Sequence, residues 1–401
     1  MDALDIMSDL DHVIPYFQPI FSADEHRIIG YEILGRYQDS EKVISLGPFF
    51  RDRSIPDEFR IEVDNVVLKK AMEKALTLDN DVLLFINRSE ELLMNDSGED
   101  LLQLLLKYQE KGISLNRIVL EISNEDPHHQ IDHLLNYYRT FGIKIAIDKM
   151  KNTSSLLDRI GDLKPDIVKV DLVPLRSMNP PQAFHEILYS LSLLARKIGA
   201  ALLFKNIEMV YQLQFAWKNG GRYYQGYYLE GPSGQFVPRD SLKNKLKTEF
   251  HEFIIYEKRK LEAIVTITDE FQSRLQVILN KTRKYNEYED LLGALAKDLE
   301  GIAFRIYICD EDGFQKSPNL IKMEKGWDIQ PEYIQKNWSW RPYFLENIVK
   351  MRKEKKGILS DLYHDIETGD ATRTFSFPLN GYDYLFIDLS YDFLYKHNQL
   401  L

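Results

Sequence analysis

Residues 117–122 read RIVLEI, a short apolar run of the kind that forms a buried strand. Similar runs occur at residues 82–86 (VLLFI), 144–148 (KIAID), 167–171 (IVKVD) and 201–204 (ALLF). Between them lie helical patterns at residues 64–76, 100–111, 131–141 and 183–198. Apolar strands that alternate with helices predict a parallel sheet covered by helices. Six or more such units in about 230 residues favour a closed α/β barrel of the TIM type.

The chain beyond the predicted barrel changes character twice. Residues 240–281 contain no Gly or Pro, and their apolar residues recur at helical spacing among many Lys and Glu. We therefore expect a barrel domain at 1–239, a helical connector at 240–283 and an α+β domain built on an antiparallel sheet at 284–401. The connector is either a solvated spacer or a helix that pairs with its twin in a homodimer.

Composition excludes several classes of protein. The 401 residues carry a formal net charge of −11, which argues against a protein that binds duplex DNA. The single cysteine, Cys309, rules out an internal disulfide framework. No apolar stretch approaches the length of about 20 residues that spans a bilayer, and the acidic N-terminus lacks the features of a signal peptide. We expect a soluble, cytoplasmic protein without a membrane span.

Polar residues stand at the ends of successive predicted strands: Glu32, Asn87, Glu121 and Asp148. A single acidic residue in such a place is usually a helix cap or a solvated charge. In a parallel barrel, however, the strand ends converge on one face, so four such residues form a possible shared site. Three carboxylates and one amide oxygen suit one divalent cation, Mg²⁺, Mn²⁺ or Ca²⁺, better than zinc.

The order of motifs resembles the EAL family of cyclic di-GMP phosphodiesterases over about residues 12 to 240. The resemblance rests on YFQPI at 16–20, YEILGR at 31–36 with its Glu-Ile-Leu, the strand-end residues, Lys169 in VKVD and QGY at 225–227. The whole chain, including its aromatic C-terminal block, is similar to a two-domain subgroup of that family.

The resemblance implies a modified TIM barrel that binds cyclic di-GMP at the carboxyl ends of its strands. In active members two divalent cations flank an attacking water and the product is linear pGpG. Glu32, Asn87, Glu121 and Asp148 would hold the first cation. The catalytic residues would be Lys169 and Glu208, and the ligand pocket would include Gln18, Arg36 and Gln225.

Departures from the family pattern predict an impaired catalytic site. Lys149 follows Asp148 where active members have a second aspartate, and the loop after it, MKNTSSL, has no glycine. Lys205 replaces the catalytic glutamate of a Glu-Gly-Val-Glu stretch, and Asn124 replaces a loop-positioning glutamate. Because an ammonium has no lone pair for a cation, the second metal site should be lost. Lys149 and Lys205 would instead contribute to ligand binding by contacting the phosphates.

The C-terminal domain resembles PAS-like and Cache-like sensor modules in its block NWSWRPYFL at 337–345. That resemblance implies an unknown small ligand held by an arginine or an aromatic cage, formed by Trp338, Trp340, Arg341, Tyr343 and Phe344. The alternative is that these aromatic residues are ordinary core.

Three functions follow as hypotheses. The first is a cyclic di-GMP receptor that has lost or nearly lost hydrolysis and acts as a homodimer. The second is an active, metal-dependent phosphodiesterase, and the third is a scaffold that binds only protein partners.

Overall fold

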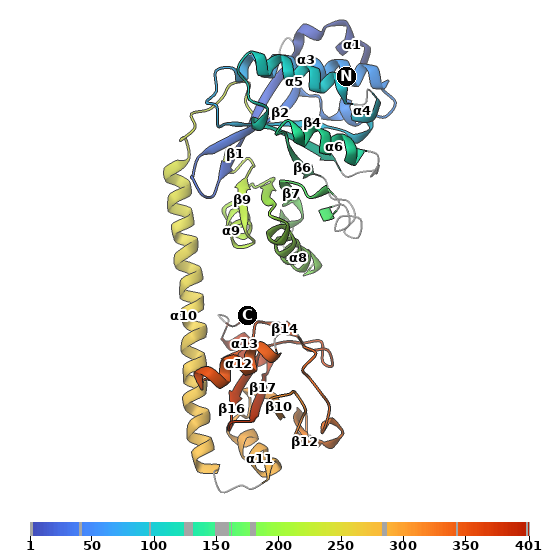
Figure 1. The fold of residues 1–401 in the computed structure, drawn as a ribbon. Coiled ribbons are helices and arrows are strands. Elements are labelled where there is room, and N and C mark those ends of the chain that lie inside the picture. Colours follow the sequence, from blue (N-terminus) through green and yellow to red (C-terminus); the bar gives the residue numbers. More distant parts are fainter. Residues whose placement is uncertain are drawn as a thin grey trace. The chain divides into compact units, whose positions relative to one another are not determined.

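The chain, seen here in a computed structural model, forms two compact units, Met1–His251 and Glu252–Leu401 (Figure 1). The structure describes residues 3–39, 42–95, 98–123, 131–148, 160–161, 163–176, 182–282, 287–341, 344–397 and 400. None of the helices in these ranges is long and apolar enough to cross a membrane.

The first unit is a closed barrel, which confirms the predicted α/β class. Its nine-stranded sheet has the order β1-β9-β8-β7-β6-β5-β4-β2-β3, and β1 also pairs with β2, so that every strand except β3 takes part in the closure. Strand β1 runs antiparallel to both of its neighbours, whereas the other strands of the closed ring pair in parallel. The strands are β1 (Val13–Ser22), β2 (Ile28–Gln38), β3 (Val43–Ser45), β4 (Leu83–Arg88), β5 (Ile118–Ser123), β6 (Lys144–Asp148), β7 (Ile167–Asp171), β8 (Ala201–Lys205) and β9 (Gly221–Tyr224).

Helices surround this barrel. They include α1 (Ala3–Ser8), α2 (Gly47–Arg51), α3 (Asp57–Ala75), α4 (Glu90–Asn95), α5 (Glu99–Glu110), α6 (Ile131–Thr140), α8 (Gln182–Ile198), α9 (Val210–Lys218) and the 3₁₀ turns η1 (Leu10–His12), η2 (Leu115–Arg117) and η3 (Val173–Arg176). Helix α3 begins at Asp57 rather than at residue 64 as predicted. Pro56 precedes it, and Asp57 and Glu58 place negative charge in its first turn, where the helix dipole favours it.

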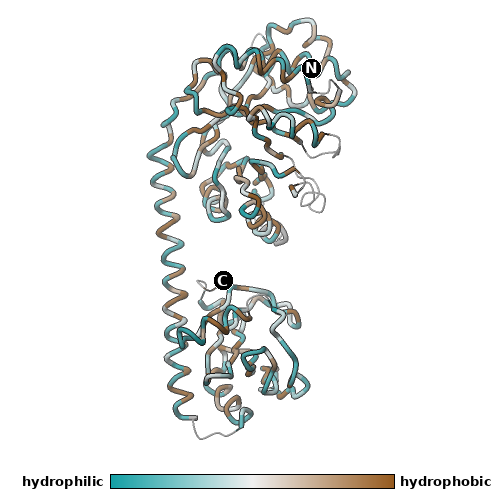
Figure 2. Tube along the Cα trace, in the orientation of Figure 1, coloured by the Kyte–Doolittle hydropathy of each residue, from teal (hydrophilic) through white to brown (hydrophobic). Residues whose placement is uncertain are grey.

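A long helix, α10 (Lys243–Thr282), occupies the region predicted as a connector. It is amphipathic along its length, with hydrophilic and hydrophobic residues alternating along the tube in Figure 2. Near its start the ring of Phe250 packs against Tyr224 of the barrel, with their centroids 5.6 Å apart. Near its end Phe271 and Leu275 are buried in the core of the second unit. The helix therefore contributes to both cores.

The second unit is built on an antiparallel six-stranded sheet of order β12-β11-β10-β17-β16-β13, as predicted. Side chains alternate along β10, so that Ile306 and Ile308 join the core containing α10 and α11 while Tyr307 and Cys309 face α12. The elements are α11 (Tyr288–Asp298), β10 (Ala303–Asp310), β11 (Asn319–Met323), β12 (Gly326–Gln330), η4 (Pro331–Tyr333), α12 (Phe344–Glu354), β13 (Ile358–Leu359), β14 (Tyr363–His364), β15 (Ala371–Thr372), β16 (Thr374–Pro378), β17 (Asp383–Leu389) and α13 (Tyr391–Lys396).

Candidate ligand and metal site in the barrel

A polar layer lies directly beyond the barrel core, at the carboxyl ends of the parallel strands. The core contains one buried residue from each of seven strands, among them Phe85, Val119, Ala146, Ile167 and Leu203. Because alternate residues of a strand point to the same side, the residue two positions later also points into the barrel. Those residues are Asn87, Glu121, Asp148, Lys169 and Lys205. The strand periodicity thus gathers these predicted site residues into one layer.

Lys169 is the centre of this layer. Its side chain is fully buried, and its ammonium Nζ lies 2.6 Å from Glu121 Oε1 and 2.9 Å from Glu32 Oε2. Glu32 also accepts hydrogen bonds from the amides of Asn87, at 2.8 Å, and Gln225, at 2.7 Å. One buried cation therefore holds two carboxylates together.

The two carboxyls differ in their pKa values. Burial opposes ionisation of Glu32, but the Lys169 charge and the hydrogen bonds of Asn87 and Gln225 outweigh it and lower the pKa of Glu32 to about 2. Burial and the neighbouring Glu32 charge raise the pKa of Glu121 to about 8 in spite of Lys169. Burial lowers the pKa of Lys169, yet Glu121 and Glu32 outweigh it and raise that pKa overall. The surroundings therefore favour the ionised form of Glu32 more strongly than that of Glu121.

A second ion pair lies beside the first. The Lys205 ammonium lies 2.5 Å from Asp148 Oδ1 and 2.8 Å from Asp148 Oδ2, and both side chains are largely buried. Lys205 ends β8 and Asp148 ends β6, so β7 lies between them in the sheet. The position at which the family pattern has a catalytic glutamate thus carries a cation that neutralises one of the predicted metal ligands.

The layer forms the floor of a cavity of about 310 Å³. Glu32, Asn87, Glu121, Asp148 and Lys205 all line it, and Arg36 lies in its wall. The Arg36 guanidinium donates to the Gly35 carbonyl and lies 5.5 Å from the centre of the Tyr16 ring. A cation beside a mixed layer of carboxylates and ammonium groups gives a cavity suited to a ligand with phosphate groups.

The donor set fits one hard divalent cation. In the part of the chain that the structure describes, no three His, Cys, Asp or Glu side chains are grouped as metal ligands. The Lys169 ammonium lies between Glu32 and Glu121 instead. However, Glu121 Oε2 is buried and has no hydrogen-bond partner among those same residues. A buried oxygen of this kind is able to coordinate a cation. All the predicted donors are oxygens, as Mg²⁺, Mn²⁺ and Ca²⁺ require.

Lys169 and Gln225 contact Glu32 without lining the cavity, and two more predicted site residues, Glu208 and Gln18, also lie outside its lining. Glu208 forms an ion pair with Arg176, and both side chains are partly exposed. Gln18 lies opposite Glu32 in the β1–β2 ladder but does not line the cavity. Lys149 and Asn124 lie outside the described residues. The roles predicted for these four residues remain predictions.

Sequence reasoning missed a buried charged cluster in the second unit. Arg305 of β10 contacts Asp388 at 2.7 Å and Glu367 at 2.9 Å, and it also pairs with Asp365. The available signal was Arg305 itself, a charged residue within the apolar strand AFRIYICD.

Comparisons with known proteins agree with this architecture. Residues 1–232 match the EAL domain, and residues 236–401 match the EAL-domain associated signalling protein domain. The chain is 50% identical over 406 aligned positions to the EAL-domain containing protein YkuI of Bacillus subtilis (strain 168), with 100% of both proteins covered. The crystal structure of YkuI in complex with substrate c-di-GMP and calcium covers 100% of both chains with a TM-score of 0.95.

A more distant relative matches the first unit alone. The probable cyclic di-GMP phosphodiesterase PdeG of Escherichia coli (strain K12) is 23% identical over 228 residues, which are 55% of this chain and 44% of PdeG.

Proposed function

Since this chain belongs to the EAL-domain family, we propose that its barrel binds cyclic di-GMP and holds it without hydrolysing it. The binding half of this proposal is supported by the cavity at the carboxyl ends of the strands and by the c-di-GMP complex of YkuI, a relative with half of its residues identical. The dinucleotide would lie over the polar layer, with Arg36 near one phosphate.

One divalent cation belongs to this proposal. Glu32, Asn87, Glu121 and Asp148 would hold it, and Glu121 Oε2 offers an oxygen without a hydrogen bond. When bound, the cation would supply positive charge for a phosphate oxygen. Calcium accompanies c-di-GMP in the YkuI structure, which supports a divalent ion in this barrel.

The ion pair between Lys205 and Asp148 carries the inference that hydrolysis is lost. A second cation needs oxygen ligands, but the ammonium of Lys205 has no lone pair and repels a cation nearby. The Nζ of Lys205 lies 2.5 Å from Asp148 Oδ1. Lys205 therefore contributes positive charge at a position where the family pattern has a carboxylate. A two-metal reaction stabilises both the attacking and the leaving oxygen, so the loss of one metal should abolish or nearly abolish turnover.

A calorimetric titration of cyclic di-GMP into the full chain with Mg²⁺ tests the proposal, combined with chromatography of the mixture. We expect saturable heat and unchanged cyclic di-GMP after prolonged incubation. Accumulation of pGpG would show an active phosphodiesterase. An absence of heat would leave a scaffold without nucleotide binding, and either result would overturn the proposal.

Two variants test why hydrolysis is lost. The double substitution Lys205→Glu with Lys149→Asp returns both carboxylates of the family pattern, and we expect measurable pGpG formation. Lys205→Met is the matched control, because it removes the ammonium without adding an oxygen ligand and should stay inactive. If the double variant binds the nucleotide but forms no pGpG, the two lysines do not explain the loss.

A further inference from the structure

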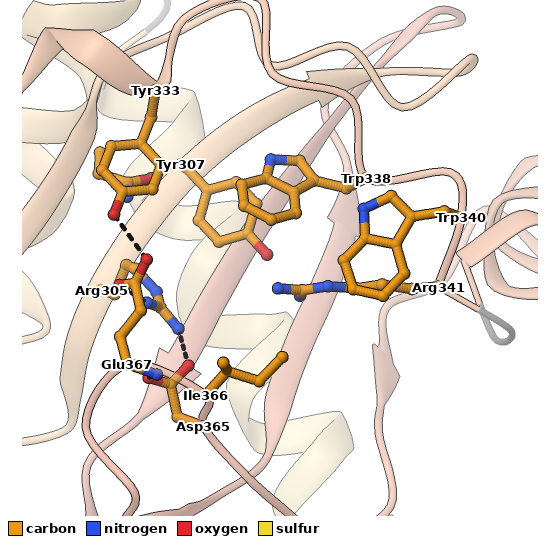
Figure 3. A pocket seen from close by; sticks show the side chains of 10 residues that line it. Arg305, Tyr307, Tyr333, Trp338, Trp340, Arg341, Asp365, Ile366 and Glu367 are labelled. Atoms are coloured by element: carbon orange, nitrogen blue, oxygen red, sulfur yellow. Dashed lines mark hydrogen bonds and ion pairs between the residues drawn. The ribbon is translucent and has the colours of Figure 1, made fainter.

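A second cavity, of about 220 Å³, lies in the C-terminal unit and is separate from the barrel site. It is smaller than the roughly 300–1,000 Å³ typical of sites for drug-sized ligands, so its size suits only a small molecule. Charged side chains of both signs and four aromatic residues line it (Figure 3). The lining residues are Arg305, Tyr307, Asn319, Tyr333, Trp338, Trp340, Arg341, Asp365, Ile366 and Glu367.

One end of this cavity is acidic. Asp365 and Glu367 both contact Arg305, whose Nε is also paired with the fully buried Asp388 at 2.7 Å. Three carboxylates therefore surround a single guanidinium and leave an excess of negative charge. Glu367 also accepts a hydrogen bond of 2.5 Å from the Tyr333 hydroxyl, which fixes its position. An ammonium group is the natural counterpart of this end.

The other end presents a cation and an unused donor. The Arg341 guanidinium lies 4.6 Å from the centre of the Trp338 ring, on the side of the cavity opposite Glu367 in Figure 3. Tyr307 is 5% exposed and lines the cavity, and its hydroxyl makes no hydrogen bond to another described residue. Burial raises the pKa of Tyr307, so the hydroxyl keeps its proton and can donate it. A hydroxyl that lines the cavity beside a guanidinium, with no hydrogen-bond partner among the described residues, is suited to a carboxylate.

The walls between the two ends are held in place by the protein. Trp338 Nε1 donates to Gln315 Oε1 at 2.9 Å, and Gln315 Nε2 in turn donates to Asn319 Oδ1 at 2.9 Å. Gln315 and Asn319 are buried. Because this network is satisfied without a ligand, the aromatic wall is formed in advance and costs no ordering on binding.

We propose that this cavity binds a free α-amino acid, with its carboxylate at Arg341 and Tyr307 and its ammonium at Glu367 and Asp365. The formal charges of the four charged lining residues sum to zero: the end with Arg305, Asp365 and Glu367 is net negative, and the end with Arg341 is positive. A simple amine would bring no acceptor for the Tyr307 hydroxyl, and a simple anion would face two carboxylates. A zwitterion satisfies both ends, and its side chain would rest on the aromatic wall.

Calorimetric titration of the full chain with each of the twenty common amino acids tests this inference. For the best binder, two analogues separate the contributions of its charges: the amine that lacks the carboxylate and the 2-oxo acid that lacks the ammonium. We expect each analogue to bind at least about tenfold more weakly, the size of one lost charge-assisted hydrogen bond. The proposal would be overturned if none of the twenty bound at about 10 mM, a concentration that saturates even a site with a millimolar dissociation constant. Equal binding of either analogue would also overturn it.

Substitutions locate the binding site. Tyr307→Phe keeps the ring and removes only the hydroxyl, so it should weaken the amino acid about tenfold. Glu367→Gln should weaken the amino acid but not the 2-oxo acid. Tyr288→Phe is the matched control, because its hydroxyl donates to Asp383 and does not line the cavity. Binding unaffected by both test variants, or weakened equally by the control, would place the ligand elsewhere. Urea denaturation of each variant checks that the C-terminal unit is folded.

Discussion

At the scale of single residues, Lys169 is the side chain on which the barrel site depends. It is buried together with Glu32 and Glu121, so its removal leaves two carboxyls in a nonpolar environment without a counterion. Lys169→Met keeps a long side chain and removes the charge. We expect the free energy of unfolding to fall by about 3–5 kcal/mol, measured by urea denaturation.

This loss should depend on pH. Without the ammonium, the pKa of Glu121 in the folded state rises further above its ordinary value of 4.5, and the pKa of Glu32 rises because it loses the nearby charge that lowers it. A raised folded-state pKa adds stability that is complete below pH 4.5 and disappears as the pH rises through the folded value. The variant should therefore be most destabilised above pH 8. Arg176→Gln, which breaks the partly exposed pair with Glu208, is the control and should cost at most about 1 kcal/mol at either pH. Equal losses in the two variants would contradict the role of burial.

Residue identity in the polar layer was predictable, but the pairing was not. The positions of Asn87, Glu121 and Asp148 follow from strand periodicity, because each closes an apolar run. The partners of Lys169 lie 48 and 137 positions away in the sequence, at Glu121 and Glu32. Only the closure of the barrel brings them together. Likewise nothing in the sequence indicated that Lys205 would reach across to Asp148.

At the scale of secondary-structure elements, the segment after β9 is fixed by close backbone contact. Ile207 N donates to the Gln225 carbonyl at 3.1 Å, and Tyr228 N donates to the Ile207 carbonyl at 2.9 Å. A Cβ on Gly226 would lie 2.1 Å from the oxygen of Ile207 and 2.3 Å from its nitrogen. The absence of a side chain at Gly226 therefore allows the segment that follows β9 to place Gln225 against Glu32.

Gly226→Ala should force these two segments apart and lower the free energy of unfolding by about 3 kcal/mol. Gly293→Ala is the opposite case, since Gly293 lies inside helix α11 and a Cβ there meets nothing within 4 Å. We expect it to raise stability by about 0.5–1 kcal/mol, because alanine favours the helix. Urea denaturation of both variants measures the difference, and a neutral Gly226→Ala would show that the contact relaxes.

The strands β4 to β8 lie at the apolar runs, as predicted, whereas the sequence of β1 indicates a strand less clearly. It contains Pro15 and Pro19, residues that usually argue against a strand inside a sheet. Both are tolerated because β9 pairs with β1 only at Phe21 and Ser22, so at Pro15 and Pro19 only β2 is paired with β1. The two-residue strands β14 and β15 are too short to give any pattern, although the loop between them provides Asp365 and Glu367.

At the scale of the whole molecule, helix α10 leaves apolar side chains uncovered. Leu261 is 61% exposed and Val265 is 60% exposed, one turn apart on the same face, and Ile254 lies seven residues before Leu261. Such spacing is typical of a helix that pairs with another. We therefore expect a homodimer through α10.

Leu261→Asp with Val265→Asp should shift the dimer towards monomer by at least about tenfold in dissociation constant, measured by light scattering at micromolar concentrations. Arg259→Asp is the control, since it adds the same residue about half a turn away around the helix. If the unchanged chain is already monomeric, or the control dissociates equally, α10 does not pair through this face.

The distribution of tryptophan has an optical consequence. Trp217 lies in the barrel, whereas Trp327, Trp338 and Trp340 all belong to the C-terminal unit. Trp338 and Trp340 line the small cavity there, and the exposed Trp340 forms part of its rim (Figure 3). Ultraviolet emission from this protein therefore reports mainly on its C-terminal unit. A molecule that enters the cavity replaces water beside two indoles. Its binding should therefore change the wavelength and the intensity of tryptophan fluorescence, without any added dye.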